Sequence, residues 1–269
     1  MPYYICVTCG TQYPQSDQPP AHCPICEDER QYVNPTGQAW TTLDALRPDH
    51  HMVIEPLETN LHHLKPEPKI GIGQYAHLVQ TPHGNILWDC VPFIDDATVA
   101  AIHALGGISH IAISHPHFHT VMVDWSQAFD NAPIYIHAGN RTDVVRPDPA
   151  IHYWEGDTQP LLDGVTLVRC GGHFVGSAVL HWRAGAEGRG VLLTADTIFV
   201  VADTRYATFM YSYPNQIPLP TSKVRQIVAA VEPFAFDRLY GGFGAVMDGA
   251  AKTKVIASAE RYIRAISEL

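Results

Sequence analysis

The sequence contains few charged residues and no long hydrophobic run. Only 16% of its 269 residues are charged and 46% are hydrophobic, so the chain has enough apolar material for a sizeable core. No apolar run approaches the roughly 18 residues that a membrane span needs. The first ten residues, MPYYICVTCG, lack the basic start and apolar stretch of a secretory signal. We therefore expect a soluble, cytoplasmic protein.

Basic residues are also scarce. The sequence has 17 Lys and Arg against 27 Asp and Glu, which gives a formal net charge of −10. This charge disfavours phosphate backbones and anionic membrane surfaces as main partners. We therefore expect a small-molecule substrate and neither nucleic acid nor a membrane as a partner. Whether the chain forms a homo-oligomer is left open.

Four of the six cysteines form two C-x-x-C pairs, Cys6 with Cys9 and Cys23 with Cys26. Each C-x-x-C turn aims two sulfurs at one ion, and two facing turns complete a tetrahedral thiolate site. This arrangement is typical of a metal site in a reducing compartment rather than of disulfides. The pairs therefore predict a small metal-binding knuckle at the N-terminus.

The segment Tyr4–Gly10, followed by Tyr13-Pro14, resembles the first half of rubredoxin, and Cys23-Pro-x-Cys resembles its second half. The loop between the halves is much shorter than in rubredoxins. We therefore predict a rubredoxin-like or zinc-ribbon module over residues 1–40, with a structural zinc ion and electron-carrying iron as the alternative. If the ribbon is purely structural, removing it by replacing Cys6 and Cys9 is expected to leave the metal of the main domain in place.

The main domain is predicted over residues 41–269, and from Met52 onward the sequence alternates strand-like and helix-like segments, which predicts packed sheets with helices outside. A hairpin is expected from His77 to Cys90, with its turn at residues 82–85. Helices are expected at 95–105, 221–231 and 250–266. Further strands are expected at 108–114, 133–137, 165–168, 178–182 and 191–194.

Histidines and one aspartate follow several of these strands. His115 and His117 are two residues apart after the strand at 108–114, so in extended chain they share a face and can meet one ion. His173 follows the strand at 165–168, and Asp196 follows the strand at 191–194. The pattern predicts one metal site assembled at strand ends from His115, His117, His173 and Asp196.

The order and context of these residues resemble the metallo-β-lactamase superfamily. The resemblance implies an α/β fold, an αβ/βα four-layer sandwich, with the metal site along one edge. It also implies that Asp89, after the hairpin, orients a metal ligand without binding the ion. In the hydrolases of the superfamily the first motif reads H-x-H-x-D-H. Here His119 replaces the aspartate and Thr120 the last histidine, while Phe243 stands where a later histidine is expected.

These replacements remove most ligands of a second metal, so we expect one Zn or Fe ion in the main domain. The leading interpretation is a metallo-hydrolase that acts on an ester, thioester, lactone or amide through metal-activated water. Asp196 and His119 are the predicted catalytic residues, with His119 accepting a proton or orienting water. Trp154, Tyr211 and Phe243 are candidates for the pocket wall. The alternatives are a mono-iron oxidoreductase or dioxygenase of the same fold, and a non-catalytic metal-binding relative.

Overall fold

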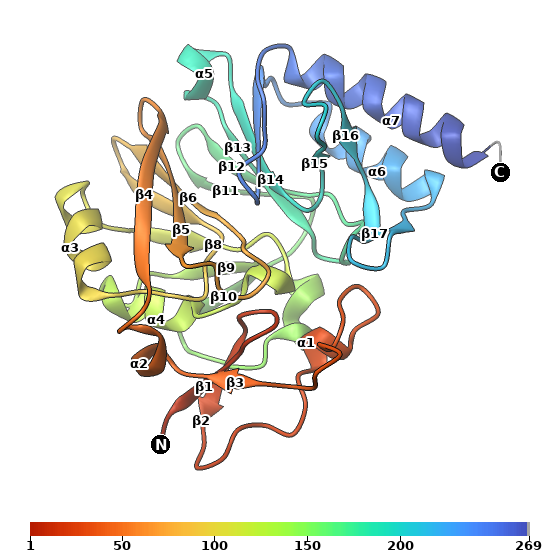
Figure 1. The fold of residues 1–269 in the computed structure, drawn as a ribbon. Coiled ribbons are helices and arrows are strands. Elements are labelled where there is room, and N and C mark those ends of the chain that lie inside the picture. The colour runs from red at the N-terminus through yellow and green to blue at the C-terminus, as the bar shows by residue number, and fades with distance from the viewer. Residues whose placement is uncertain (268–269) are drawn as a thin grey trace. The chain divides into compact units, whose positions relative to one another are not determined.

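A computed structural model of the chain describes residues 1–267. The chain divides into two compact units. The first comprises residues 1–136 and 141–153, and the second comprises residues 137–140 and 154 onward. Each unit is built around its own large β-sheet (Figure 1).

The N-terminal segment of the first unit forms a small three-stranded sheet in the order β2-β1-β3. Its strands are β1 (Tyr3–Cys6), β2 (Gln12–Gln15) and β3 (Trp40–Thr41). A short helix, α1 (Pro24–Glu27), carries the second cysteine pair, and α2 (Leu43–Leu46) follows the sheet. Because β3 pairs with β1, the small sheet continues to Thr41. The boundary between modules at residue 40 stays a prediction.

The rest of the first unit is built on a seven-stranded sheet in the order β10-β9-β8-β7-β6-β5-β4. The strands β4 to β7 are antiparallel neighbours, whereas β8 lies parallel to both β7 and β9. The bounds of the strands are β4 (His51–Glu58), β5 (Leu61–Glu67), β6 (Ala76–Thr81), β7 (Gly84–Trp88), β8 (His110–Ala112), β9 (Ile134–His137) and β10 (Ile151–Trp154).

Two helices connect the strands that lead to the predicted donors. Helix α3 (Asp96–Ala104) lies between β7 and β8, and α4 (Met122–Ala128) lies between β8 and β9. The carboxylate of Asp95 caps α3 by accepting a hydrogen bond of 2.7 Å from the backbone N–H of Thr98. Two short 3-10 helices, η1 (Pro116–Phe118) and η2 (Ala138–Asp143), complete the connections. The helix predicted at 95–105 is thus confirmed.

The second unit contains a six-stranded sheet in the order β11-β12-β13-β14-β19-β20. Helices α6 (Thr221–Val231) and α7 (Ala251–Ser267) lie side by side (Figure 1). They bury their apolar faces with the sheet in one hydrophobic core. The sheet consists of β11 (Thr158–Leu162), β12 (Val165–Arg169), β13 (Ala178–Trp182), β14 (Val191–Ala195), β19 (Arg238–Gly241) and β20 (Val246–Met247).

Shorter elements fill the loops of the second unit. They are α5 (Gly185–Gly188), β15 (Phe199–Val200), β16 (Ala207–Thr208), β17 (Met210–Ser212) and β18 (Ile217–Pro218). The segment 209–215 contains a strand, β17, which pairs with β18. A three-residue strand gives too little alternation to be read from sequence.

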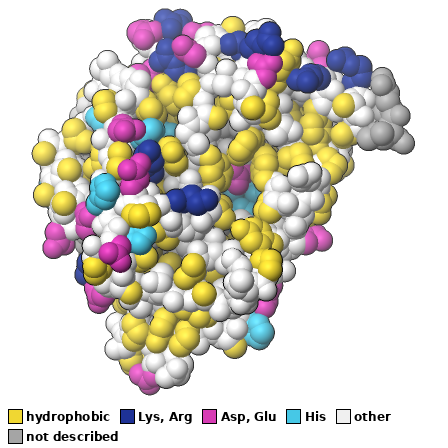
Figure 2. All heavy atoms as spheres, in the orientation of Figure 1, with side chains coloured by type: hydrophobic (Ala, Val, Ile, Leu, Met, Phe, Trp, Pro, Cys, Tyr) yellow, Lys and Arg dark blue, Asp and Glu magenta, His cyan; other side chains and the backbone are white. Residues whose placement is uncertain are grey.

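Several surface charges form ion pairs. Arg189 pairs with both Glu187 and Asp237, and Arg205 pairs with Asp203. On the face drawn in Figure 2, basic side chains lie among acidic ones and do not merge into a continuous basic area. None of the helices within residues 1–267 combines the length and hydrophobicity needed to span a bilayer.

The buried imidazole of His77 on β6 makes the fold sensitive to acid. Burial lowers its pKa to about 3, with a smaller effect from His63. An unfolded histidine titrates near 6.5, so below that pH the unfolded chain binds a proton that the folded chain excludes. The contribution of His77 to the free energy of unfolding is therefore fully present above pH 6.5 and is lost progressively as the pH falls towards 3.

We expect urea unfolding to show that the free energy of unfolding falls by about 2 kcal/mol between pH 7 and 5 because of His77. His77→Gln should show a shallower pH dependence, and an equal slope in both proteins would contradict this assignment.

Candidate metal centres

The four cysteines of the knuckle form a closed sulfur cluster. The Sγ atoms of Cys6 and Cys26 are 3.5 Å apart, those of Cys9 and Cys23 are 3.6 Å apart, and all four lie within 4.8 Å of one another. Sulfurs bound tetrahedrally to one zinc ion at about 2.3 Å are separated by about 3.8 Å, so the spacing fits an ion. All four side chains are buried and none forms a disulfide. The predicted knuckle site, defined by these four cysteines, is confirmed as a set of donors that fits a metal.

Two further contacts orient these sulfurs. The hydroxyl of Tyr13 donates to Cys23 Sγ at 3.1 Å, and the side-chain amide of Gln38 donates to Cys6 Sγ at 3.1 Å. Tyr13 also packs edge-on against Trp40, with ring centroids 5.2 Å apart. Hydrogen bonds to metal-bound sulfur stabilise its negative charge. The knuckle therefore has the outer contacts of a thiolate site as well as the sulfurs.

In the first unit, the chain leaving β8 delivers His115 and His117. Their ligand atoms lie within 4.8 Å of each other, and the two rings meet edge-on with centroids 5.0 Å apart. Both side chains are buried. The hydroxyl of Ser114 lies 2.9 Å from His115 Nδ1. An imidazole that donates from Nδ1 presents an unprotonated Nε2, which is the form a metal binds.

Asp89 fixes the start of this histidine segment. It follows β7 in a left-handed conformation with φ 64°, and its backbone N–H donates to the Ala112 carbonyl at 2.8 Å. Its carboxylate accepts a hydrogen bond of 2.7 Å from the backbone N–H of Ser114, the residue before His115. Asp89 thus holds the backbone that carries a predicted ligand, as expected for a residue that orients the site.

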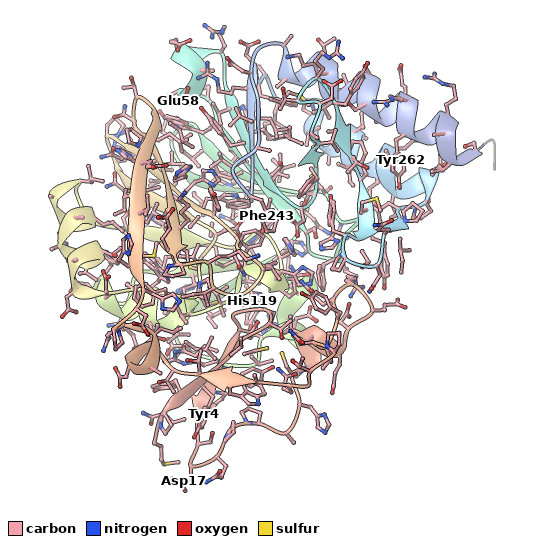
Figure 3. The ribbon with its side chains drawn as sticks, viewed as in Figure 1. Tyr4, Asp17, Glu58, His119, Phe243 and Tyr262 are labelled. Atoms are coloured by element: carbon pink, nitrogen blue, oxygen red, sulfur yellow. The ribbon has the colours of Figure 1, made fainter. Side chains whose placement is uncertain are left out.

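His119 follows η1 directly (Figure 3). Its side chain is 2% exposed and lines a cavity of about 10 Å³, together with Thr120 and Arg146. Burial lowers the pKa of His119 to about 3, the nearby His115 and His117 lower it further, and the backbone of Asp143 acts in the opposite direction. The imidazole is therefore neutral at pH 7. Its catalytic role stays a prediction.

In the second unit, the chain leaving β12 delivers His173 through two glycines. Gly171 and Gly172 have φ of 66° and 85°, which favours glycine. A Cβ atom on Gly172 would lie 2.8 Å from the Ile227 side chain, so any larger residue at this position would collide with the core. The backbone N–H groups of Cys170 and Gly171 both donate to the Ser177 carbonyl, which closes the loop around His173.

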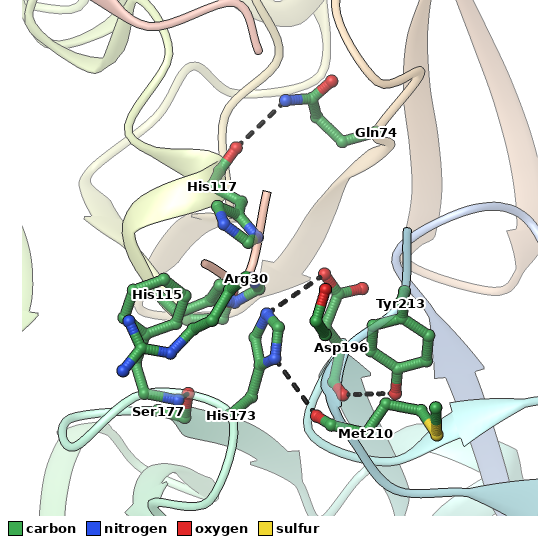
Figure 4. A network of polar contacts seen from close by, with 12 residues as sticks. Arg30, Gln74, His115, His117, His173, Ser177, Asp196, Met210 and Tyr213 are labelled. Carbon is green, nitrogen blue, oxygen red and sulfur yellow. Dashed lines mark hydrogen bonds and ion pairs between the residues drawn. The ribbon is translucent and has the colours of Figure 1, made fainter. Parts of the chain in front are cut away.

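The ring of His173 is held in one tautomer. Nδ1 lies 3.2 Å from the backbone carbonyl of Met210, which can only accept, so Nδ1 carries the proton and Nε2 faces Asp196 (Figure 4). Nε2 is 3.8 Å from Asp196 Oδ2. This is longer than a hydrogen bond and close to the separation of about 3.4 Å between two ligands of one tetrahedral zinc ion. The donor pair of the second unit therefore fits a metal.

Asp196 follows β14, where Ala195 turns the chain with φ 45°. The hydroxyl of Tyr213 donates to the backbone carbonyl of Asp196 at 2.8 Å, and the Tyr213 ring packs on His173 with centroids 5.7 Å apart. Burial raises the pKa of Tyr213 well above its usual value, with a further contribution from Asp196. Tyr213 therefore stays a neutral donor that holds the Asp196 backbone and packs against the ring of His173.

The three predicted pocket residues have different surroundings. Trp154 is 5% exposed and packs edge-on against His137, with centroids 4.6 Å apart. Tyr211 packs against the core of the second unit. Phe243 lies in the turn between β19 and β20 (Figure 3) and packs on Phe199, with centroids 5.9 Å apart. Their roles in a pocket stay predictions.

Several residues around the donors were not singled out from the sequence. Ser114 touches His115, Tyr213 and the Met210 carbonyl support His173 and Asp196, and Gln74 donates to the His117 carbonyl at 3.0 Å (Figure 4). The contact of Ser114 could have been predicted from the sequence, because Ser114 directly precedes the predicted ligand His115. Gln74 and Tyr213 lie far along the chain from the residues they contact, and no spacing rule connects them.

Comparison with solved structures identifies the fold. The DIM-1 metallo-β-lactamase matches 78% of this chain and 98% of its own, with 15% identity and a TM-score of 0.59. The SMB-1 metallo-β-lactamase in complex with mercaptoacetic acid matches 82% of this chain and 97% of its own, with 17% identity and a TM-score of 0.53. MEM-A1, a subclass B3 metallo-β-lactamase from a soil metagenome library, matches 80% of this chain at a TM-score of 0.52. The chain thus has the metallo-β-lactamase fold, preceded by a four-cysteine knuckle.

No family model matches the sequence. The uncharacterized protein YmaE of Bacillus subtilis (strain 168) is 50% identical over 269 residues, which cover 99% of this chain and 98% of YmaE. Identity at that level over nearly the whole of both chains includes the knuckle as well as the larger fold. The chain belongs to the same family as YmaE.

Proposed function

We propose that this chain is a metal-dependent hydrolase of a small molecule and that His115, His117, His173 and Asp196 hold one metal ion. The observation that carries the proposal is one buried pair of donors in each unit, His115 with His117 and His173 with Asp196, each following a strand. The ligand atoms within each pair lie within 4.8 Å of each other. A site of three imidazoles and one carboxylate suits zinc or iron, and these ligand types do not favour one metal over the other.

Two further observations support a single shared ion. The match to the DIM-1 enzyme covers 78% of the chain, which is more than either unit contains, so it includes residues of both units. In addition, outer contacts orient His115 and His173, as is usual for histidines that bind metal.

A bound divalent ion would supply an acidified water and polarise the scissile carbonyl. The residues of the chain provide the surroundings for that chemistry. Asp196 brings a negative charge next to His173, and Tyr213 holds the Asp196 backbone in place. His119, whose pKa is lowered to about 3, is a weak base, so of its two predicted roles we favour orienting water over accepting a proton.

Metal analysis combined with a substrate screen tests this function. Protein purified without added metals should contain two ions per chain, one at the knuckle and one at the proposed histidine site. It should hydrolyse at least one member of a panel of chromogenic esters, thioesters, lactones and amides, and Asp196→Asn should abolish that activity. Iron at the histidine site with oxygen consumption would instead support the oxidative alternative. Full metal occupancy without turnover of any panel member would favour a non-catalytic relative.

We expect His119→Ala to leave the metal content unchanged. The cavity beside His119 is about 10 Å³, roughly the space of one water molecule, and the cationic side chain of Arg146 lines it. A second cation there would be repelled by that charge. Metal counting on wild type and variant should therefore give two ions per chain in both, the knuckle ion included. A fall from three ions to two in the variant would identify His119 as a ligand and the histidine site as dinuclear.

A further inference from the structure

A buried glutamine links the knuckle to the segment that carries His117. Gln74 lies in the connection between β5 and β6 and has no exposed surface. Its side-chain amide donates two hydrogen bonds, one of 3.2 Å to the Cys9 carbonyl and one of 3.0 Å to the His117 carbonyl. One planar NH₂ group thus joins the backbone of a knuckle ligand to the backbone of a proposed ligand of the main domain. Figure 4 shows the second of these bonds, from Gln74 to the His117 carbonyl.

The knuckle turn that receives this bond is tightly enclosed. Gly10 adopts φ 84°, and a Cβ atom there would lie 2.7 Å from Pro92. On the other side, a Cβ atom on Gly71 would lie 3.2 Å from the Cys9 carbonyl. Both glycines have positive φ and close neighbours, so the Cys9-Gly10 turn packs tightly against Pro92 and against the connection that carries Gln74.

A second connection reaches the same histidine segment. The backbone N–H of Gln12 donates to the Thr120 carbonyl at 3.1 Å. Thr120 has φ 35°, a strained conformation for a β-branched residue that needs support from its surroundings. Arg146 adds to the contact by donating to both the Gln12 side chain and Asp124 on α4. The segment from His115 to Thr120 is therefore held from the knuckle at two points, His117 and Thr120.

We propose that the knuckle positions this histidine segment and that Gln74 is the positioning residue, so that the ion of the knuckle strengthens metal binding at the histidine site. The inference rests on the metal site of the proposed function. Four thiolates bound to one ion hold the Cys6–Cys9 turn in one conformation. The Cys9 carbonyl of that turn accepts a hydrogen bond from Gln74, and Gln74 in turn holds the carbonyl of His117 in position. Outer contacts of this kind change metal affinity by about 10- to 100-fold. The knuckle thus does more than stabilise its own segment.

The test compares two substitutions of glutamine by methionine. Gln74→Met removes both hydrogen bonds at similar volume. Gln80→Met is the matched control, because the side chain of Gln80 on β6 also donates to a backbone carbonyl, that of Leu105 at 2.8 Å, away from both metal centres. Zn²⁺ affinity is measured by competition with a chromophoric chelator. Co²⁺ substitution then separates the two sites, since thiolate ligands give intense charge-transfer absorption and the histidine site gives only weaker visible bands.

We expect Gln74→Met to lower the Zn²⁺ affinity of the histidine site by about 10- to 100-fold and to alter its Co²⁺ bands, with the thiolate absorption unchanged. Gln80→Met should leave both sites as in wild type. Equal histidine-site affinities in folded Gln74→Met and wild type would overturn the inference. If Gln74→Met does not fold, Gln74→Asn, which keeps the amide but is one methylene too short to reach both carbonyls, takes its place with the same expected loss. A wild-type protein that binds no metal at the histidine site would instead refute the proposed function.

Discussion

Replacing His173 with alanine is expected to remove the ion of the histidine site while leaving the knuckle ion in place. His173 is one of three proposed imidazole ligands, and its ring is held by the Met210 carbonyl with Nε2 facing Asp196. Losing a ligand weakens binding more than losing an outer contact, so we expect the affinity to fall by more than about 100-fold. Elemental analysis after dialysis should then show one ion per chain instead of two.

His181→Ala is the matched control for this experiment. His181 is a buried histidine of the same unit, on β13, and its Nε2 lies 2.8 Å from the backbone carbonyl of Ala235. It therefore resembles His173 in burial and in hydrogen bonding to a carbonyl but is not a proposed ligand. The control should keep both ions. Equal metal content in His173→Ala and wild type would show that His173 does not bind the metal.

Replacing Cys6 and Cys9 together with serine is expected to release the knuckle ion and to unfold the predicted N-terminal module, residues 1–40. The segment is too small to form an independent hydrophobic core, so the ion supplies most of its folding free energy. We expect rapid proteolysis within this segment and the loss of one ion per chain. Because Gln74 bonds to the Cys9 carbonyl, we also expect weaker metal binding at the histidine site.

This second expectation differs from the one drawn from the sequence, in which an isolated ribbon leaves the main-domain metal in place. Cys90→Ala provides the control, since Cys90 is a buried thiol whose pKa is raised well above its usual value by burial and it belongs to neither metal site. Proteolysis and metal affinity should be unchanged in this control. Unchanged histidine-site affinity in the double variant would restore the view of an independent ribbon.

The sequence predicted those parts of the fold that have strong local signals. The hairpin of β6 and β7 has Gly84 at its turn, and α6 runs from Thr221 to Val231 as the apolar spacing indicates. The donors could be predicted because each follows a buried strand, as His115 follows β8 and Asp196 follows β14. The strand expected at 108–114 proved shorter, at His110–Ala112, because the backbone N–H of Ser114 bonds instead to the Asp89 carboxylate.

Other parts of the structure depend on contacts that local sequence does not encode. The paired strands β4 and β5 were missed because their polar and apolar residues alternate poorly, with exposed Glu55 and Pro56 in the middle of β4. Gln74 was missed because a single glutamine in a loop carries no signal, and its role follows only from the two carbonyls it bridges. Long-range hydrogen bonds of this type can be recognised only in three dimensions.

The central proposal is that His115, His117, His173 and Asp196 hold one ion. Anomalous diffraction from crystals, recorded above and below the absorption edge of the bound metal, tests it most directly because it locates each ion and names its ligands. We predict two peaks per chain, one among the four knuckle cysteines and one bound by His115, His117, His173 and Asp196. A further peak at His119, or no peak at the four proposed ligands in metal-loaded protein, would contradict the account.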